Sequence, residues 1–183
     1  MPKKPLYIVL DTTAFVQDPN LIGPEVRLLE EFAKGHNRTI IVSEIVFAEA
    51  VNQFKEHLEK HLVEMDKTKG TLSWLTNRPH VKSKEFDVKT ETQGYQSRLH
   101  SRLNSIGTVF LPYPNVNHKD LVIRDLARKR PFRDGRGYRD TLIWHSILEQ
   151  VSKNPGDYIL VTKNSRDFCL DTDVQQTVTC LQI

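Results

Sequence analysis

The chain has 183 residues, which is most simply the length of one domain. A hydrophobic fraction of 38%, a charged fraction of 27% and a net charge of +3 describe an ordinary globular protein, and none of them identifies a partner. No apolar run approaches the roughly 20 residues of a membrane span, and Cys169 and Cys180 make neither a disulfide framework nor a zinc site, so we expect a cytoplasmic protein with reduced thiols and no membrane partner.

Short apolar runs alternate along the chain with longer segments of helical periodicity. The first run, 6–11, suits a strand buried on both faces, and a helix follows it from Pro24 to Gly35. Runs rich in β-branched residues predict further strands later in the chain. These predicted strands cover 38–43, 108–114, 157–162 and 177–183.

The remaining helices show apolar residues in steps of three and four. Ser43 is a natural N-cap for a helix that we expect to end near residue 69, and Asn117 caps another. Further helices are predicted over 89–105 and 139–152, and a polar loop over 76–88. Strands that alternate with helices favour one α/β domain over 1–183, with a parallel sheet covered on both faces.

Three acidic residues lie where a predicted strand ends or a predicted helix begins. Asp11 follows the first strand, Asp167 follows the strand 157–162, and Asp140 opens the helix 139–152. Each has a structural explanation by itself, since an acid can cap a turn or favour the first turn of a helix. Ligands of parallel sheets bind at the carboxyl ends of the strands, so we expect these acids to converge.

Glu49 is a fourth candidate, within the helix that Ser43 caps. It is the only charged residue from Ile45 to Val51, and an isolated carboxylate in apolar surroundings needs a cationic partner, a proton or a metal. Glu44 competes with it, but Glu44 lies in the first helical turn, where the helix dipole explains an acid. We therefore favour Glu49. Four convergent carboxylates would repel one another, and Mg²⁺ or Mn²⁺ would relieve that repulsion.

The segments around these acids resemble the motifs of the PIN-domain nuclease family. The matching segments, in order, are "VLDTTAF", "VSEIVFAEA", "YRDTLIWHSILE" and "LVTKNSRDF", and they span residues 9–168. The stretch "RKRPFRDGRGYRDTLIW" is similar, more narrowly, to a bacterial PIN-like subgroup with a basic loop before the third acid. The resemblance implies a three-layer α/β/α fold with a central parallel sheet and metal-dependent endonuclease action on RNA.

The resemblance also assigns roles to individual residues. The acids carried over as catalytic and metal-binding residues are Asp11, Glu49, Asp140 and Asp167. The supporting motif positions are Thr12 or Thr13, Thr162 and Asn164. Because Asn164 stands where some relatives have an acid, the number of bound Mg²⁺ or Mn²⁺ ions, one or two, stays open. A helical insert around 55–105 exceeds the compact family core.

A basic stretch before Asp140 is the candidate surface for RNA. Its nucleic-acid-binding candidates are Arg130, Arg133, Arg136 and Arg139. Such a cluster binds phosphate without sequence preference, and Phe132 and Tyr138 could stack on unpaired bases. The alternatives are a solvated loop with its aromatics in the core, or arginines that pair with Asp134 or with the acids. His145 lies on another helix face from Asp140, and we interpret it as structural.

Several functional questions stay open at this point. The favoured function is a metal-dependent endoribonuclease that hydrolyses single-stranded or structured RNA, as a toxin, a defence effector or a processing enzyme. A flap-type or single-strand DNA nuclease and a non-catalytic RNA-binding module are the alternatives. An antitoxin or other regulatory protein, and a second copy of the chain, are candidate partners besides RNA. A phosphatase that forms a phospho-aspartate would need a second Asp where Thr13 stands.

Overall fold

The computed structural model describes residues 4–77, 86–132, 136–164, 168 and 178–182. Its centre is a five-stranded sheet in which all neighbouring strands are parallel. The strands are β1 (Leu6–Leu10), β2 (Thr39–Ser43), β3 (Val109–Leu111), β4 (Asp157–Thr162) and β5 (Val178–Gln182), in the spatial order β3-β2-β1-β4-β5. The predicted parallel sheet is confirmed.

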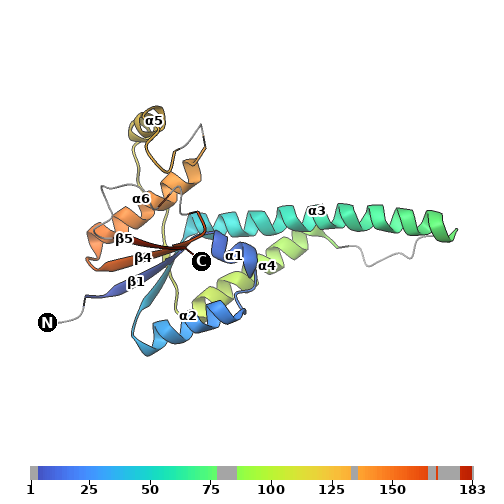
Figure 1. Ribbon diagram of the computed structural model, residues 1–183, viewed down its shortest axis with the longest axis horizontal. Coiled ribbons are helices and arrows are strands. Elements are labelled where there is room, and N and C mark those ends of the chain that lie inside the picture. Colours follow the sequence, from blue (N-terminus) through green and yellow to red (C-terminus); the bar gives the residue numbers. More distant parts are fainter. Residues whose placement is uncertain (1–3, 78–85, 133–135, 165–167, 169–177, 183) are drawn as a thin grey trace.

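Helices cover both faces of this sheet. They are α1 (Thr13–Gln17), α2 (Pro24–Gly35), α3 (Glu44–Thr76), α4 (Val88–Ser105), α5 (His118–Leu126) and α6 (Tyr138–Lys153). Figure 1 shows α5 and α6 on one side of the sheet and α2 and α4 on the other. The fold is therefore an α/β sandwich of the PIN-like kind that the sequence predicted.

The strand register brings the ends of three strands to one edge. Leu10, the last residue of β1, pairs with Val42 in β2 and with Val161 in β4. The residues that follow these positions therefore lie beside one another. Among them are Asp11 after β1 and Thr162 at the end of β4, so the register alone begins to build a polar site.

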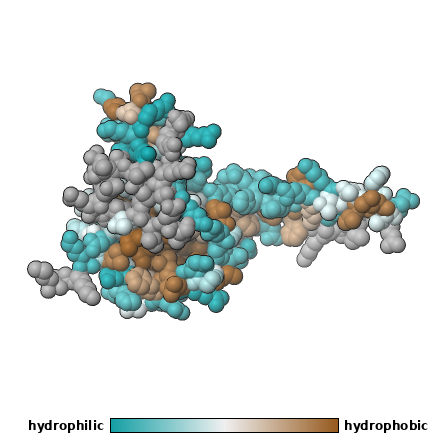
Figure 2. All heavy atoms as spheres, in the orientation of Figure 1, coloured by the Kyte–Doolittle hydropathy of each residue, from teal (hydrophilic) through white to brown (hydrophobic). Residues whose placement is uncertain are grey.

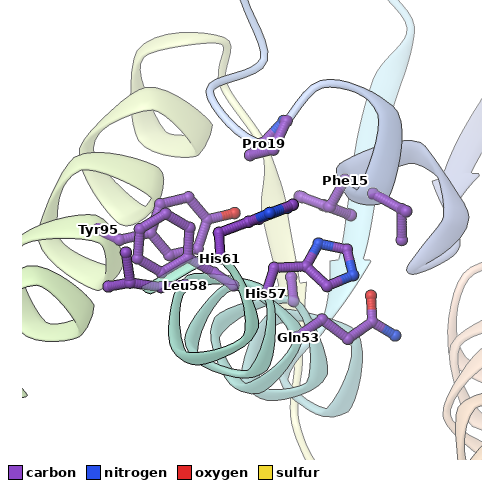
Figure 3. Close-up of a pocket in the computed structure, with 10 residues that line it drawn as sticks. Phe15, Pro19, Gln53, His57, Leu58, His61 and Tyr95 are labelled. Atoms are coloured by element: carbon purple, nitrogen blue, oxygen red, sulfur yellow. The ribbon is translucent and has the colours of Figure 1, made fainter. Parts of the chain in front are cut away.

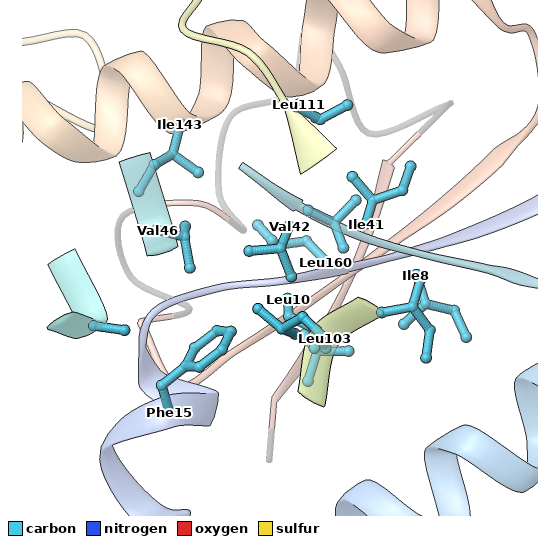
Figure 4. Packing of buried hydrophobic residues seen from close by; sticks show 14 of the residues in the cluster. Ile8, Leu10, Phe15, Ile41, Val42, Val46, Leu103, Leu111, Ile143 and Leu160 are labelled. Atoms are coloured by element: carbon cyan, nitrogen blue, oxygen red, sulfur yellow. The ribbon is translucent and has the colours of Figure 1, made fainter. Parts of the chain in front are cut away.

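The core lies between the sheet and its two helical layers. Ile41 in β2 and Leu160 in β4 are fully buried, as are Ile143 on α6 and Leu103 on α4. Figure 4 shows Ile143 reaching the strands from one side and Leu103 from the other. Burying each such side chain stabilises the fold by about 1.5–3 kcal/mol, which holds the sheet edge in a fixed position.

Two of the predicted helix starts are confirmed in atomic detail. The hydroxyl of Ser43 accepts a hydrogen bond from the N–H of Val46, and the side chain of Asn117 accepts one from the N–H of Lys119. These side chains satisfy backbone N–H groups that have no partner inside the helix. By contrast, the short helix α1, directly after Asp11, was not predicted, since five residues show no readable period.

Helix α3 forms an arm that extends beyond the sandwich (Figure 1). Its 33 residues reach Thr76, so the prediction of an end near residue 69 was wrong. At about 1.5 Å per residue the helix is about 50 Å long. Ion pairs at i, i+4 spacing, such as Lys60–Glu64, support its exposed side. The arm ends at Asn77, whose φ of 50° is left-handed.

Helix α4 runs back from the arm and is anchored to the sandwich. Arg102 Nη2 lies 2.7 Å from Glu30 Oε2 on α2, and Arg102 Nε donates to the carbonyl of Leu21 at 2.9 Å. Hydrogen bonds from Lys34 and then from Arg102 lower the pKa of Glu30. The predicted helical insert is thus an antiparallel pair, α3 and α4, whose base belongs to the core.

The far end of the arm carries exposed apolar side chains. Trp74 is 80% exposed and Leu75 is 64% exposed, and Figure 2 shows hydrophobic atoms gathered at this end.

In the part of the chain that the structure describes, none of the helices has the length and apolar character that a membrane span needs.

Candidate active site

Asp11 lies at the carboxyl end of the central strand β1 and is 3% exposed. Its backbone N–H donates to the carbonyl of Val161 at 3.1 Å, which fixes the residue against β4. Its carboxylate oxygen Oδ2 accepts hydrogen bonds from two hydroxyls, Thr162 Oγ1 at 2.7 Å and Thr13 Oγ1 at 3.3 Å. The position of this buried carboxylate is therefore set by β4 and by the start of α1.

Glu49, on α3, is the second acid at this edge. Its Oε2 accepts a hydrogen bond from Thr12 Oγ1 at 2.8 Å, and its Oε1 lies 2.9 Å from Arg139 Nη1. The Glu49 side chain is 12% exposed. Since Thr12 is the neighbour of Asp11, this hydrogen bond holds α3 against the end of β1. We call Asp11 and Glu49 the acid pair; Glu44, the competing candidate, is exposed in the first turn.

The hydroxyls around Asp11 are themselves held by the backbone after β4. Thr162 Oγ1 accepts from the N–H of Asn164 at 2.9 Å, and Thr13 Oγ1 accepts from the N–H of Lys163 at 3.0 Å. Each hydroxyl thus accepts from one N–H and donates to the carboxylate, an arrangement in which successive hydrogen bonds strengthen one another. The network explains why both threonines stand beside the acid.

Asp140 and Arg139 are placed by the start of α6. Gly137 precedes this helix with a φ of 95°, and a Cβ there would lie 2.2 Å from the carbonyl oxygen of Pro131. Only glycine fits this conformation and this space. Asp140 is half-buried in the first turn, where the helix dipole favours an acid. Arg139, one residue earlier, reaches Glu49.

The four predicted acids are only partly covered by the described residues. Asp167 lies outside them, so its place relative to the acid pair stays a prediction. Within the ranges that the structure does describe, no three His, Cys, Asp or Glu side chains are close enough together to hold a metal ion. Asn164 is described, and its carbonyl accepts from the N–H of Phe168 at 3.4 Å. The convergence of all four acids therefore also stays a prediction.

The donor chemistry of the acid pair fits a hard divalent cation. Its two carboxylates and the hydroxyls of Thr12, Thr13 and Thr162 are oxygen donors, which Mg²⁺ and Mn²⁺ prefer. Arg139 already supplies one positive charge to Glu49. Two carboxylates at the same edge of the sheet favour a nearby countercharge, and a cation at the acid pair would add to that of Arg139 or replace it.

The basic stretch divides into residues with different surroundings. Arg136 is exposed, and Arg139 is 62% exposed while paired with Glu49. Arg130 is half-buried, and its Nη1 is buried with no hydrogen-bond partner among the described residues. Arg133 lies outside the described residues. Pairing with the acids, one alternative for these arginines, thus holds for Arg139.

The two aromatic side chains of this stretch also differ. Tyr138 is 51% exposed, so base stacking stays open for it. Phe132 is 5% exposed, and the expectation that it could stack on RNA bases was wrong. The backbone of Pro131 and Phe132 lies close to Gly137, directly before α6.

His145 does not belong to the acid pair. It is half-buried on α6, and its Nε2 is buried without a hydrogen-bond partner in the described part of the chain. Burial, and secondarily the charge of Arg124, lowers the pKa of His145. These surroundings favour the neutral ring and agree with a structural interpretation.

Sequence reasoning left the partner of Arg139 open and missed the role of Gly137. The pairing of Arg139 with Glu49 joins residues 90 positions apart, and its sequence signal was only the position of Arg139 directly before the third acid. Gly137 had a clearer signal, since a glycine just before a helical period indicates a special backbone conformation.

Comparison with protein families gives one match, to the family model described as PIN domain, over residues 8–168. The match includes every predicted motif. No curated protein and no solved structure matches the chain.

Proposed function

The chain belongs to the PIN-domain family, whose members are generally metal-dependent nucleases, and on this premise we propose that it is an endoribonuclease dependent on Mg²⁺ or Mn²⁺. The observation that carries the proposal is the acid pair. Asp11 and Glu49 come from motifs far apart in the sequence, and Thr12 and Thr162 hold them at one edge of the sheet. Two fixed carboxylates at the carboxyl end of parallel strands suit binding of a metal and a phosphate.

In this proposal the residues of the chain bind the ion, orient it and attract the substrate. Asp11 and Glu49 would hold the ion, together with Asp140 and Asp167 from the remaining motifs. When bound, Mg²⁺ or Mn²⁺ makes water more acidic and stabilises the charge that develops on the phosphate. Thr162 and Thr13 keep the Asp11 carboxylate oriented, and the exposed side chains of Arg139 and Arg136 would attract phosphates.

The choice of RNA over DNA is part of the proposal. Hydrolysis directed by a metal does not need the 2′-hydroxyl, so the acid pair itself fits either nucleic acid. The basic stretch that leads into Asp140 suits an extended, single-stranded backbone. We include a toxin, defence or processing role, and regulation by an antitoxin or by a second copy of the chain, as extensions of the same proposal.

The test is a cleavage assay on three substrates. Purified protein is incubated with transfer RNA, with unstructured RNA and with single-stranded DNA of the same sequence, first with Mn²⁺ and then with Mn²⁺ and excess EDTA. We expect internal cuts in RNA that EDTA abolishes. If only DNA is cut, the proposed substrate changes from RNA to single-stranded DNA. If no substrate is cut with Mn²⁺ or Mg²⁺, the proposal is wrong.

A further inference from the structure

A cavity of about 280 Å³ lies beside the acid pair, between α1, α3 and α4. Figure 3 shows side chains from all three helices around it, with Phe15 from α1, Gln53 and His57 from α3, and Tyr95 from α4. His57 and His61 line the cavity and are exposed, so it is open to solvent on their side. Two of the residues that line the cavity, Phe15 and Ala50, stand at the ends of nuclease motifs. The other lining residues lie outside the motifs.

The cavity continues the active site by one helical turn. Gln53 follows Glu49 by four residues on α3, and Phe15 follows Thr12 by three residues at α1. Four residues correspond to about 6 Å along a helix axis. That distance is comparable to a single step along a polynucleotide backbone. A strand whose phosphate lies at the acid pair can therefore place a neighbouring nucleotide at the cavity.

The walls of the cavity suit a flat, uncharged group. The rings of Phe54 and Tyr95 stack on each other, with centroids 4.0 Å apart and an interplanar angle of 8°, and they close the inner wall. The flat side chains on the open side of the cavity are the exposed rings of His57 and His61. Among the described residues that line the cavity, none is Lys or Arg, so it does not suit a phosphate. A volume near the lower end of the usual range for ligand pockets, about 300–1,000 Å³, excludes a large cofactor. An aromatic face that accepts any flat base is the usual device for holding single-stranded nucleic acid.

One polar atom of the residues that line the cavity lacks a partner among the described residues. Gln53 Oε1 is buried and has no hydrogen-bond partner within the described residues. A buried acceptor without a donor costs free energy that a ligand N–H would recover. Figure 3 also shows the hydroxyl of Tyr95 directed toward the space between α1 and α3. Burial raises the pKa of Tyr95 to about 12, so this hydroxyl stays protonated and can donate.

We propose that this cavity holds one unpaired nucleobase of the substrate, next to the phosphate at the acid pair, with an N–H of the base donating to Gln53 Oε1. The proposal rests on the proposed function, since the acid pair defines where the phosphate lies. It gives the helical insert around 55–105 a role, because His57, His61 and Tyr95 of the cavity wall come from it. The base in the cavity would bias which RNA positions are cut.

Binding without metal separates base recognition from cleavage. Three short, labelled oligomers of equal length are compared. The first is oligoadenylate, the second has purine, a base without the amino group, in place of every adenine, and the third is abasic. Fluorescence anisotropy in EDTA gives the dissociation constants. We expect wild type to bind oligoadenylate at least about fivefold more tightly than the abasic oligomer, since stacking one base contributes at least that much.

Gln53→Leu tests the acceptor, and Gln93→Leu is its matched control, because Gln93 is an exposed glutamine on α4. Gln53→Leu should bind oligoadenylate about threefold to tenfold more weakly than wild type does. Its affinity for the purine oligomer, and its affinity for the abasic oligomer, should each equal that of wild type. Gln93→Leu should behave as wild type. Gln53→Leu should melt no lower than wild type, since it removes a buried acceptor that has no partner.

Equal affinities for oligoadenylate and the abasic oligomer, or an unchanged affinity in Gln53→Leu, would overturn the base site. Cleavage of the same oligomers with Mn²⁺, measured in parallel, distinguishes this failure from failure of the proposed function. Cleavage without base-dependent binding would refute the cavity and leave the nuclease. Base-dependent binding that Gln53→Leu weakens, without cleavage of any RNA, would refute the nuclease and leave the base site.

Discussion

Arg139 at the start of α6 and Glu49 on α3 form an ion pair, with Nη1 2.9 Å from Oε1. The pair gives Glu49 a countercharge and places a guanidinium beside the proposed metal site. Because Arg139 is 62% exposed, the pair contributes up to about 1 kcal/mol to stability. Its larger consequence is competition, since a cation that binds Glu49 meets the positive charge of Arg139.

Arg139→Ala should therefore strengthen metal binding while it weakens RNA binding. We expect the melting temperature without metal to fall slightly and the increase on adding Mn²⁺ to become larger. The affinity for Mn²⁺ should rise by up to about fivefold, from the loss of a pair worth up to about 1 kcal/mol. Thermal melts over a Mn²⁺ titration measure this increase in melting temperature. Arg136→Ala is the control, because Arg136 is an exposed arginine of the same stretch. A smaller increment in Arg139→Ala than in Arg136→Ala would contradict the competition.

Thr162→Val should destabilise the fold and the site together. The change removes the 2.7 Å hydrogen bond to Asp11 and leaves the N–H of Asn164 without its acceptor. Losing both should lower the free energy of unfolding by about 2–4 kcal/mol, measured by urea denaturation. Thr162→Ser is the control, because it keeps the hydroxyl and should lose less than about 1 kcal/mol. Equal losses in both variants would mean that the methyl group, not the hydroxyl, matters.

The double variant Arg133→Ala with Arg136→Ala should flatten the salt dependence of RNA binding. Each phosphate contact of a single strand contributes about 0.7 to the slope of log affinity against log salt, so the slope should fall by up to about 1.4. Anisotropy over a salt series in EDTA gives both slopes. The matched control is Lys34→Ala with Lys153→Ala, on α2 and at the end of α6, which removes the same charge. If both double variants change the slope equally, the basic stretch has no special role.

His145 should make the protein less stable as the pH falls below about 6.5. Burial lowers its pKa in the folded state, so the unfolded chain binds the proton first and unfolding becomes more favourable. The stabilising contribution is present above the pKa of the unfolded chain and is lost as the pH falls through the folded pKa. His145→Phe lacks this titration. Urea denaturation at pH 7.5 and pH 5 should show wild type losing stability relative to His145→Phe, and a constant difference would contradict it.

The sheet and the helix caps could be predicted because their signals are local. A buried parallel strand reads as a continuous apolar run, as in β1, and Ser43 and Asn117 stand directly before the helices they cap. The sequence also placed Asp11 at the carboxyl end of the first strand, and the structure shows that this strand is the central one. The length of α3 could not be predicted from an apolar stripe, because the stripe ends at Met65 and the apolar residues of the last turns, such as Leu72 and Trp74, are exposed.

The partners of the acids could not be read from the sequence. The threonine motif positions were predicted, but Thr12 bonds to Glu49 and Thr162 to Asp11 through contacts 37 and 151 residues apart. Such pairings depend on strand register and on where α3 begins relative to β1. The cavity beside Gln53 likewise exists only because α4 folds back along α3.

The rate of RNA cleavage by Asp11→Asn compared with wild type tests the central claim most directly. The substitution keeps the size of the side chain and can still accept from Thr162, but it removes the charge that would hold the ion. With Mn²⁺ we predict a rate at least about 100-fold lower than that of wild type, a barrier increase of about 2.7 kcal/mol. The fold should survive, and Asp120→Asn, an exposed first-turn acid on α5, should cut at the wild-type rate. Cleavage by pure, folded Asp11→Asn at the wild-type rate would contradict the account.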